Sequence, residues 1–505
     1  MQTEIITLGG PAHGGYCVGR LAAGKVIMVR GGLPGETVEV EVTSERSKVA
    51  YGRVVQVKTA SADRVPHIWP EGETKDLGGV ELGHVAYPAQ LRWKRDVVRD
   101  AIRRNGSSEL LAELDQAHPG WEVESSGSEP GRTRVSFTVS EGGGLGMYEA
   151  AAHNVHTVRS FPLLVPELVD LDLFRRHWEF APGTRLRVIA PSNSAPVLFV
   201  DGQTFSVDGE PTTSRVRETV HVSDLTFTYR IFSGSFWQTD RRAPATLAAA
   251  LRDALGQIEG FEAWELYSGS GLFSLFLAQG LGAKGRLTTV EGDGPATKSA
   301  AYNLAKAGFD QVEVRRGDVS PQLLRSLPMG EMVSQGTLVV ADPPRSGLGK
   351  AVARAICAQH PDLVALFSCD PVSCARDLET MRQLGYRVKT WRVFDLFPYT
   401  SHVETIVLLS KLDSKKKYIS VELPMDDMGL TSAESKATYK QIQNYVFKKF
   451  GFKVSNLYIA QVKEKCGIKE RENYNKPKKE DLKQPICPIE KEEAIKDAFR
   501  YFQMI

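Results

Sequence analysis

Cysteine is scarce in this chain, and the few thiols lie far apart. The 505 residues include six cysteines, at Cys17, Cys357, Cys369, Cys374, Cys466 and Cys487. They are too few and too scattered for the disulfide scaffold of a small secreted protein. Nowhere do about 18 apolar residues follow one another, which excludes a transmembrane helix, and no charged-then-apolar leader opens the chain. We therefore expect a soluble protein of the cytoplasm, with no membrane partner.

Lysine is rare in the first four fifths of the chain, and arginine is rare in the rest. Residues 1–411 contain 33 arginines and 11 lysines against 47 acidic residues, whereas residues 412–505 contain 17 lysines and 2 arginines against 14 acidic residues. The hydrophobic share of 42% and the charged share of 25% are ordinary for globular domains. The length suggests about three or four domains. The change in composition indicates that a separate, lysine-rich module begins near residue 412.

Residues 1–60 are predicted to form a small β-barrel. Apolar and polar residues alternate at 26–30 and 38–42, between glycine turns, which is the pattern of antiparallel strands. This stretch resembles the TRAM domain, a barrel appended to RNA-modifying enzymes, and a purely structural barrel is the alternative. Residues 61–235 are predicted to be a linker and a central α+β region. It contains a helix at 88–106 and strand-like runs at 133–139, 185–190, 197–200 and 225–231.

Strand and helix alternate in residues 236–411. This order predicts a mostly parallel sheet that binds ligands at the carboxyl ends of its strands. The strand-like runs lie around Leu266 and at 287–290, 338–341, 363–368 and 405–409. The predicted fold class is multidomain α/β, in which this domain is Rossmann-like.

A glycine loop follows the first of these strands. Gly269 and Gly271 let backbone approach a ligand where a helix begins, an end that favours negative charge. Glu291 closes the next strand, where a carboxylate can accept hydrogen bonds from both hydroxyls of a ribose. No third glycine follows in the loop, so we expect an adenosine ligand smaller than a dinucleotide. A tight turn without a ligand is the alternative.

Three more polar residues lie next to strand ends of the same sheet. Asp342 opens a loop stiffened by two prolines, Cys369 follows the next strand, and Glu404 precedes the last one. Taken singly, a buried structural cysteine and a surface carboxylate are the ordinary interpretations. Taken together, a thiol, two carboxylates and the glycine loop converge on one edge of the sheet, as in a catalytic site.

The order of these motifs resembles that of the RNA 5-methyluridine methyltransferases, over roughly residues 1–411. The shared motifs are Phe236-Trp237-Gln238, Leu266-Tyr267-Ser268-Gly269-Ser270-Gly271, Glu291, Asp342-Pro343-Pro344-Arg345-Ser346-Gly347, Ser368-Cys369-Asp370-Pro371 and His402-Val403-Glu404. The resemblance implies a class I methyltransferase domain at 236–411 that uses S-adenosylmethionine, with Cys369 as nucleophile and Glu404 as general base. The cofactor-binding residues that it implies are Gln238, Tyr267, Gly269, Gly271, Glu291, Asp342 and, near the adenine, Asp318.

Methylation of uracil at carbon 5 requires the same residue types. A thiolate that adds to carbon 6 makes carbon 5 nucleophilic, and a base then removes the carbon-5 proton so that the thiol can leave, without a metal. The uracil must be flipped out of any stack, which favours loops or single strands of RNA. We expect 23S ribosomal RNA as substrate, because the transfer-RNA branch of the family generally lacks the TRAM domain. Transfer RNA is one alternative, and an RNA-binding or chaperone-like protein without turnover is another.

In one respect the chain departs from many members of that family. They hold an iron–sulfur cluster in a segment resembling Cys-Gly-Gly-Cys, where this chain has Leu77-Gly78-Gly79-Val80. Leucine and valine cannot ligate iron, and no cysteine lies between Cys17 and Cys357. We therefore expect a chain without a cluster. Smaller departures are Glu265 and Asp370, where aspartate and asparagine are usual.

The lysine-rich residues 412–505 are predicted to form short helices. Thr431 and Glu434 have the spacing of a capping box, Ser455 can cap a second helix, and a third is expected at 488–502. A nucleic-acid-binding module and a docking domain remain equal alternatives, so the partner of this accessory domain is unknown. Its two cysteines lack the paired spacing of a zinc site.

Overall fold

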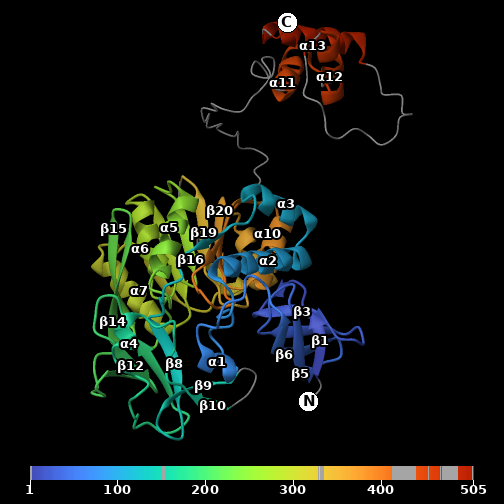
Figure 1. Cartoon of the computed structure of the whole chain (residues 1–505). Coiled ribbons are helices and arrows are strands. Elements are labelled where there is room, and N and C mark those ends of the chain that lie inside the picture. Colours follow the sequence, from blue (N-terminus) through green and yellow to red (C-terminus); the bar gives the residue numbers. More distant parts are fainter. Residues whose placement is uncertain are drawn as a thin grey trace. The chain divides into compact units, whose positions relative to one another are not determined.

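The computed structural model describes residues 3–149, 154–327, 329, 335–411, 439–452, 454–466, 468, 487–502 and 504. Contacts divide the chain into two units, Met1–Ser414 and Lys415–Ile505. Each unit is described by itself (Figure 1).

The N-terminal sheet of the first unit has six strands in the order β1-β5-β6-β4-β3-β2. The strands are β1 (Thr3–Thr7), β2 (Pro11–Ala12), β3 (Tyr16–Arg20), β4 (Val26–Arg30), β5 (Thr37–Glu45) and β6 (Val49–Thr59). Ile27, Val29, Val38 and Val40 alternate with less buried neighbours and form one apolar face, as the period-two pattern predicts. One pairing departs from the antiparallel expectation. β4 runs parallel to β6, because β5 lies between them in the chain and each connection reverses direction.

The central sheet has six strands in the order β10-β9-β8-β11-β12-β13. This region comprises β8 (Arg134–Val139), β9 (Leu145–Tyr148), β10 (Val155–Thr157), α4 (Pro166–Val169), β11 (Arg185–Ile189), β12 (Val197–Val200), β13 (Gln203–Ser206) and the hairpin β14 (Arg215–Val222) and β15 (Leu225–Phe232). Phe137, Leu186 and Val188 point into a core that also contains Phe161. Alternate residues of a strand point to opposite faces, so the polar residues between them lie on the other face.

The third sheet has eight strands in the order β18-β17-β16-β19-β20-β22-β21-β7. Its elements after residue 240 are α5 (Ala243–Leu255), β16 (Glu262–Leu266), α6 (Leu272–Leu281), β17 (Arg286–Glu291), α7 (Gly294–Lys306), β18 (Glu313–Arg316), α8 (Pro321–Ser326), β19 (Thr337–Ala341), α9 (Gly349–Ala358), β20 (Leu363–Ser368), α10 (Pro371–Gln383), β21 (Tyr386–Asp395) and β22 (Glu404–Lys411). Leu338 and Val340 of β19 face one apolar core, and Val339 and Ala341 face another. Both faces are therefore covered, as in parallel α/β sheets; only β22 runs antiparallel to the neighbours β20 and β21.

Residues 87–125 reach this third sheet from far away in the chain. After the short α1 (Pro70–Thr74), the helix predicted at 88–106 is α2 (Tyr87–Asn105), and α3 (Ser108–Ala117) leads to β7 (Val123–Ser125). β7 pairs with the end of β21, where Val123 lies opposite Val393. Val98 and Ile102 of α2 share a buried core with Trp264 and Trp391. This segment therefore builds one edge of the sheet that carries the glycine loop.

The second unit contains the helices α11 (Tyr439–Phe450), α12 (Asn456–Lys465) and α13 (Ile489–Tyr501). They enclose a small core that includes Ile442, Val446, Ile459 and Phe499. Ser455 caps α12 by accepting a hydrogen bond from the Tyr458 amide, as predicted, and α13 agrees with the helix expected at 488–502. The predicted capping box at 431–434 lies outside the described residues. Within the described ranges no helix is long and apolar enough to cross a bilayer.

Leu77 and Val80 are part of a compact apolar core. Both are buried among Trp69, Phe161 and Leu145, and the Trp69 and Phe161 rings lie 5.3 Å apart, edge to face. In the described part of the chain no three His, Cys, Asp or Glu side chains gather as metal ligands. The residues at this position therefore do not fit an iron–sulfur cluster, and the space between them is filled by packing.

We expect purified protein to contain neither iron nor sulfide in stoichiometric amounts. Iron and acid-labile sulfide should be measured after anaerobic purification, so that oxidation cannot have removed a cluster. The packing is tested separately with the Leu77→Ala variant. Its free energy of unfolding should be about 2–5 kcal/mol lower than that of the unmodified protein, because the substitution leaves a cavity in a packed core. One cluster per chain in the anaerobic sample would contradict the expectation.

Candidate active site at the carboxyl edge of the third sheet

A cavity of about 800 Å³ opens where β16, β17, β19 and β20 end. Seven of the nine residues singled out from the sequence line it: Gln238, Tyr267, Gly269, Glu291, Asp342, Cys369 and Glu404. Gly271 and Asp318 do not. The remaining lining residues include Arg132, Phe236, Arg345 and His402. The loops at the ends of neighbouring strands meet here, as in other open α/β sheets.

The glycine loop between β16 and α6 has an unusual backbone. Tyr267, Gly269 and Gly271 all have positive φ, of 62°, 55° and 89°. Such a conformation is strained for tyrosine, and residues held in this way cluster at functional sites. A Cβ on Gly271 would lie 3.3 Å from the Cβ of Ala300 on α7, so this glycine permits close packing of α6 on α7 and does not face the cavity.

Glu291, at the end of β17, is fixed by two backbone amides. Its Oε2 accepts a hydrogen bond from the Gly269 amide at 2.8 Å, and its Oε1 accepts one from the Asp293 amide at 2.7 Å. Each oxygen keeps a lone pair for another donor, which suits the hydroxyls of a ribose. Asp318 follows the neighbouring strand β18, where the Gly317 amide bonds to the Glu291 carbonyl at 2.9 Å.

Cys369 lies between β20 and the first turn of α10. The next residue, Asp370, caps this helix by accepting hydrogen bonds from the amides of Val372 and Ser373. The helix start favours a thiolate, but burial and the nearby Glu404 and Asp342 carboxyls raise the pKa of Cys369 to about 12. The charge of Arg345 opposes this rise without cancelling it, so the half-buried thiol is protonated at neutral pH.

Glu404 and Asp342 form a pair of buried carboxyls. Burial raises the pKa of Asp342 to about 7. Burial and the charge of Asp342 raise the pKa of Glu404 well above its usual value, and the Glu404 side chain is only 5% exposed. A third buried acid, Glu265, bonds to the Ser274 hydroxyl and has a pKa raised by burial to about 8. Such a group of acids suits a cationic ligand or the work of a base.

The loop that leads to Glu404 is held by α2, through residues that sequence reasoning missed. Lys94 Nζ lies 2.5 Å from Asp395 Oδ1 and donates to the Phe397 carbonyl at 2.9 Å. Gln90 Oε1 accepts from the Tyr399 amide at 2.8 Å. A signal was available in the sequence, because Gln90 and Lys94 are polar residues one turn apart on a helix face that otherwise carries apolar residues such as Trp93 and Val97.

The N-terminal sheet also touches this site. His13, in the turn between β2 and β3, lies 3.1 Å from Asp370 Oδ2. Burial alone would raise the pKa of Asp370, but the bonds from His13 and Ser373 lower it to about 2. In the same turn, a Cβ on Gly15 would lie 3.0 Å from the Glu81 side chain and 3.6 Å from that of Ser401. One turn therefore contacts the segments that precede both Glu404 and α10.

Comparison with known proteins bears on the whole first unit. A family model described as tRNA (Uracil-5-)-methyltransferase matches residues 210–412, and the TRAM domain model matches residues 2–55. An uncharacterized RNA methyltransferase of Bifidobacterium longum is 33% identical over 430 residues, which cover 81% of this chain and 97% of that protein. One from Streptomyces avermitilis is 32% identical over 440 residues, covering 80% of this chain and 97% of that protein.

Among solved structures, the Pyrococcus abyssi tRNA (uracil-54, C5)-methyltransferase in complex with S-adenosyl-L-homocysteine is similar. It matches 80% of this chain and 99% of its own length, with a TM-score of 0.57 and 19% identity. At that identity the likeness establishes the fold. The TRAM-like N-terminal part, the central region and the Rossmann-like methyltransferase domain predicted from the sequence are thus confirmed.

The buried acids predict a pH-dependent affinity for S-adenosylmethionine. Asp342, with a pKa of about 7, is neutral below that pH and anionic above it, so the cationic sulfonium should bind more tightly as the pH rises. One titrating carboxyl can change the dissociation constant by up to about tenfold per pH unit. Calorimetric titrations from about pH 6 to about pH 8 measure this change.

S-adenosylhomocysteine is the matched control ligand, because its sulfur carries no charge. Its affinity should change less over the same pH range, and Asp342→Asn should reduce the difference between the two ligands. Equal pH slopes for both ligands with the unmodified protein would contradict the prediction.

Proposed function

The chain belongs to the S-adenosylmethionine-dependent RNA uracil-C5 methyltransferases that carry a TRAM domain, and from that premise we propose that it forms 5-methyluridine in 23S ribosomal RNA. One observation above all supports turnover: a thiol, a buried carboxyl and the glycine loop line a single cavity. A protein that only bound RNA would have no use for a buried pair of acids beside a thiol. By the family resemblance, in which the transfer-RNA branch generally lacks a TRAM domain, the N-terminal sheet favours ribosomal RNA; the Pyrococcus abyssi tRNA methyltransferase, which matches 80% of this chain, is an exception to that rule.

Transfer RNA is the second candidate substrate. The matching family model is described as tRNA (Uracil-5-)-methyltransferase, and the Pyrococcus abyssi protein that shares the fold is a tRNA (uracil-54, C5)-methyltransferase. The two substrates are separated by mapping 5-methyluridine in ribosomal and transfer RNA from cells with and without this protein. Loss of a 5-methyluridine from 23S ribosomal RNA alone supports the proposal, and loss from transfer RNA alone overturns it in favour of the second candidate.

The proposed cofactor site uses the lining residues on one side of the cavity. Glu291 would accept hydrogen bonds from the ribose hydroxyls, Asp342 would balance the sulfonium, and Gln238 and Tyr267 would contact the rest of the cofactor. By the family resemblance Asp318, which follows the neighbouring strand and does not line the cavity, would contact the adenine. S-adenosylmethionine would supply the electrophilic methyl group.

In the proposed reaction Cys369 and Glu404 act on different carbons of uracil, Cys369 on carbon 6 and Glu404 on the proton of carbon 5. Cys369 gives its proton to solvent and the thiolate Sγ adds to carbon 6; the electron pair of the C5–C6 double bond moves into an enolate over carbon 5, carbon 4 and O4, which makes carbon 5 a nucleophile. After carbon 5 has taken the methyl group, the Glu404 carboxylate removes its proton, the double bond re-forms and the thiolate leaves. The raised pKa of Glu404 makes its anion a stronger base than an ordinary carboxylate. Positive charge in the cavity also lowers the cost of ionising the thiol.

Substitution of the two reacting side chains should give different outcomes. Cys369→Ala should abolish methylation and leave S-adenosylmethionine affinity unchanged, whereas Glu404→Gln should lower turnover by about 10²–10⁴-fold and accumulate a covalent protein–RNA adduct, since addition precedes proton removal. Adducts are measured by denaturing electrophoresis with labelled RNA. Cys357→Ala, in the buried face of α9, is the control and should retain turnover. Turnover by Cys369→Ala within about tenfold of the unmodified protein would contradict the mechanism.

The lysine-rich residues 412–505 are proposed to be an accessory RNA-binding module. The family model ends at residue 412, and contacts separate Lys415–Ile505 from the rest of the chain. Truncation after Lys411 should therefore leave a folded enzyme with an unchanged turnover number. The Michaelis constant for RNA should rise, and the salt dependence of binding should flatten by about 0.7 for each lost contact to single-stranded RNA. Equal affinities and salt slopes of the two proteins would instead indicate a protein-docking role.

A further inference from the structure

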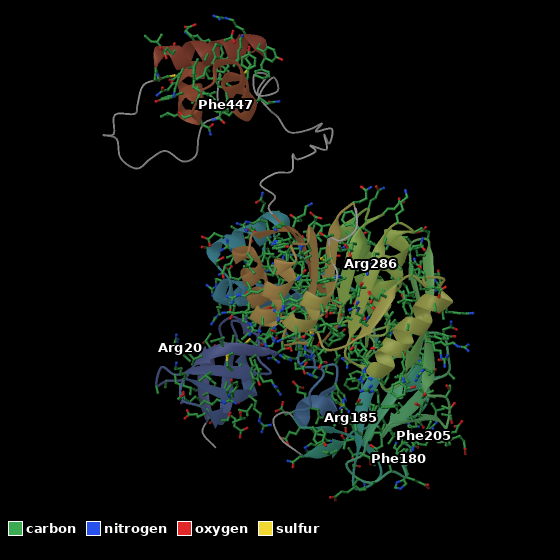
Figure 2. The ribbon with its side chains drawn as sticks, turned by 180° about the vertical axis from the view of Figure 1, so that it is seen from behind. Arg20, Phe180, Arg185, Phe205, Arg286 and Phe447 are labelled. Atoms are coloured by element: carbon green, nitrogen blue, oxygen red, sulfur yellow. The ribbon has the colours of Figure 1, made fainter. Side chains whose placement is uncertain are left out.

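A second cavity, of about 510 Å³, adjoins the active-site cavity. Five residues line both: Arg132, Gly234, Ser235, Phe236 and Thr239. The rest of its wall comes mainly from the central sheet, on which Arg185 is labelled in Figure 2. None of the residues singled out from the sequence for catalysis or cofactor binding lines this second cavity.

The strand register gathers arginines on one wall of this cavity. In the antiparallel pair β8–β11, Arg187 lies opposite Ser136 and Arg185 lies opposite Thr138. Leu186 and Val188 point into the apolar core, so the arginines of the same strand point to the other face. Arg134, at the start of β8, and Arg132, just before it, add two more guanidinium groups.

The positive charge of this wall is only partly compensated. No acidic residue lines the cavity, and within the described residues Arg132, Arg185 and Arg187 form no ion pair with a carboxylate. Arg134 is only 5% exposed and bonds to Glu218 through Nη2 at 2.9 Å, while its Nε and Nη1 have no hydrogen-bond partner. Burial lowers the pKa of Arg134. Two free donors on a buried cation call for an anionic acceptor.

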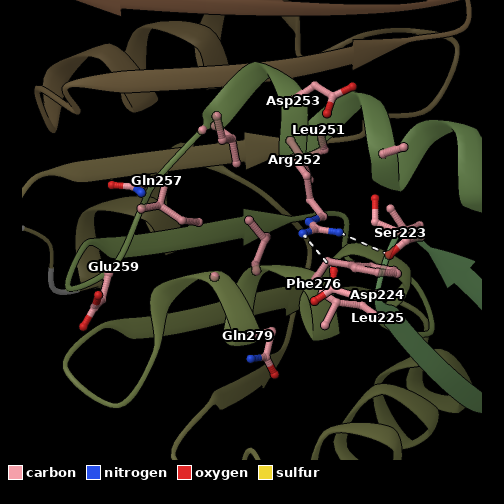
Figure 3. Close-up of a pocket in the computed structure, with 17 residues that line it drawn as sticks. Ser223, Asp224, Leu225, Leu251, Arg252, Asp253, Gln257, Glu259, Phe276 and Gln279 are labelled. Atoms are coloured by element: carbon pink, nitrogen blue, oxygen red, sulfur yellow. Dashed lines mark hydrogen bonds and ion pairs between the residues drawn. The ribbon is translucent and has the colours of Figure 1, made fainter.

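A third cavity, of about 520 Å³ near the amino end of β16, shows the contrast (Figure 3). Its arginine, Arg252, lies 3.9 Å from Asp224 and donates to the Val222 carbonyl at 3.3 Å. Asp253 and Glu259 line the same cavity. Acidic residues outnumber the single arginine there, whereas the cavity on the central sheet combines clustered cations with a buried guanidinium whose Nε and Nη1 lack hydrogen-bond partners.

Aromatic rings accompany the arginines along the sheet. The guanidinium of Arg187 lies 5.9 Å from the ring centroid of Phe199, and that of Arg215 lies 5.1 Å from the centroid of Phe232. The two rings are 5.7 Å apart, edge to face. At the junction of the two cavities Phe236 is 68% exposed. Arginines interleaved with aromatic rings form the usual surface for single-stranded nucleic acid, in which the cations bind phosphates and the rings stack on bases.

We propose that the second cavity binds the nucleotide next to the target uridine, with its phosphodiester held by Arg134, Arg185 and Arg187. The RNA strand then continues over the central sheet towards Arg215. This inference rests on the proposed RNA methylation and adds the path of the strand outside the reacting base. It also assigns the central region a direct role in positioning the RNA strand beside the active site.

The test combines a change in the protein with a change in the RNA. Arg185→Ala/Arg187→Ala should raise the Michaelis constant for RNA at least tenfold, with the turnover number changed less than threefold and the affinity for S-adenosylmethionine unchanged. The salt slope of RNA binding should fall by about 1.4, or about 0.7 for each of two lost phosphate contacts. Arg185→Glu, at an exposed position, repeats the measurement without disturbing the bond from Arg187 to the Gly234 carbonyl.

The matched control protein is Arg175→Ala. Arg175 is 86% exposed and lies 3.7 Å from Asp172, in the same central region but outside the cavity. It should bind RNA as the unmodified protein does. The change in the RNA is a neutral methylphosphonate at one linkage beside the target uridine, and the unmodified RNA is its control. It should weaken binding to the unmodified protein at least tenfold and leave binding to Arg185→Ala/Arg187→Ala unchanged.

Three outcomes distinguish this inference from the proposed function. Unchanged affinity and salt slope in both arginine variants, with normal methylation, overturn the inference and leave the proposed function standing. An equal loss in Arg175→Ala overturns it too, because general charge would then explain the effect. If the unmodified protein forms no 5-methyluridine but the methylphosphonate effect is seen, the RNA site stands and the proposed function fails.

Discussion

A buried ion pair between Lys94 and Asp395 fixes the geometry on which the active site depends. Both side chains are fully buried and 2.5 Å apart. Burial lowers the pKa of Lys94, and the charge of Asp395 opposes that effect. Such a pair gives little net stability compared with apolar packing, but removal of one partner would leave a buried charge, at a cost of about 3–5 kcal/mol. Its role is therefore one of position, since it ties α2 to the loop that ends at Glu404.

The two adjoining cavities differ in the charge of their walls. Carboxyls gather where the sheet ends, around Asp342 and Glu404, whereas guanidinium groups gather on the face of the central sheet. A cationic cofactor and a polyanionic substrate would each find the opposite charge on its own side. The one arginine common to both walls, Arg132, marks the boundary. In the proposed reaction, this separation would keep RNA phosphates away from the acidic side chains.

Structural features that depend on the local sequence pattern were predicted best. The strands at 338–341 and 363–368 are continuous apolar runs because they are central strands covered on both faces, and the site residues next to such strands came together as expected. Gly271 was expected at the ligand but packs helices, since a positive φ serves both purposes. β7 has three residues and pairs with a strand some 270 positions later, which no local pattern reveals. The buried state of Lys94 and the contact of His13 with Asp370 likewise arise only from tertiary packing.

Cys369 and Glu404 face each other because two strands share a register. Ser368 at the end of β20 lies opposite Thr405 on β22, which brings the residues just beyond, Cys369 and Glu404, side by side. The 34 residues between them form α10 and β21, and β21 pairs with β22 as far as Phe394 opposite Glu404. Length changes in the turn between α10 and β21 can therefore accumulate without moving Cys369 or Glu404. A single-residue insertion within β20 or β22 would instead turn Cys369 or Glu404 away from the cavity. The protein should therefore tolerate insertions in the turn far better than insertions in these two strands.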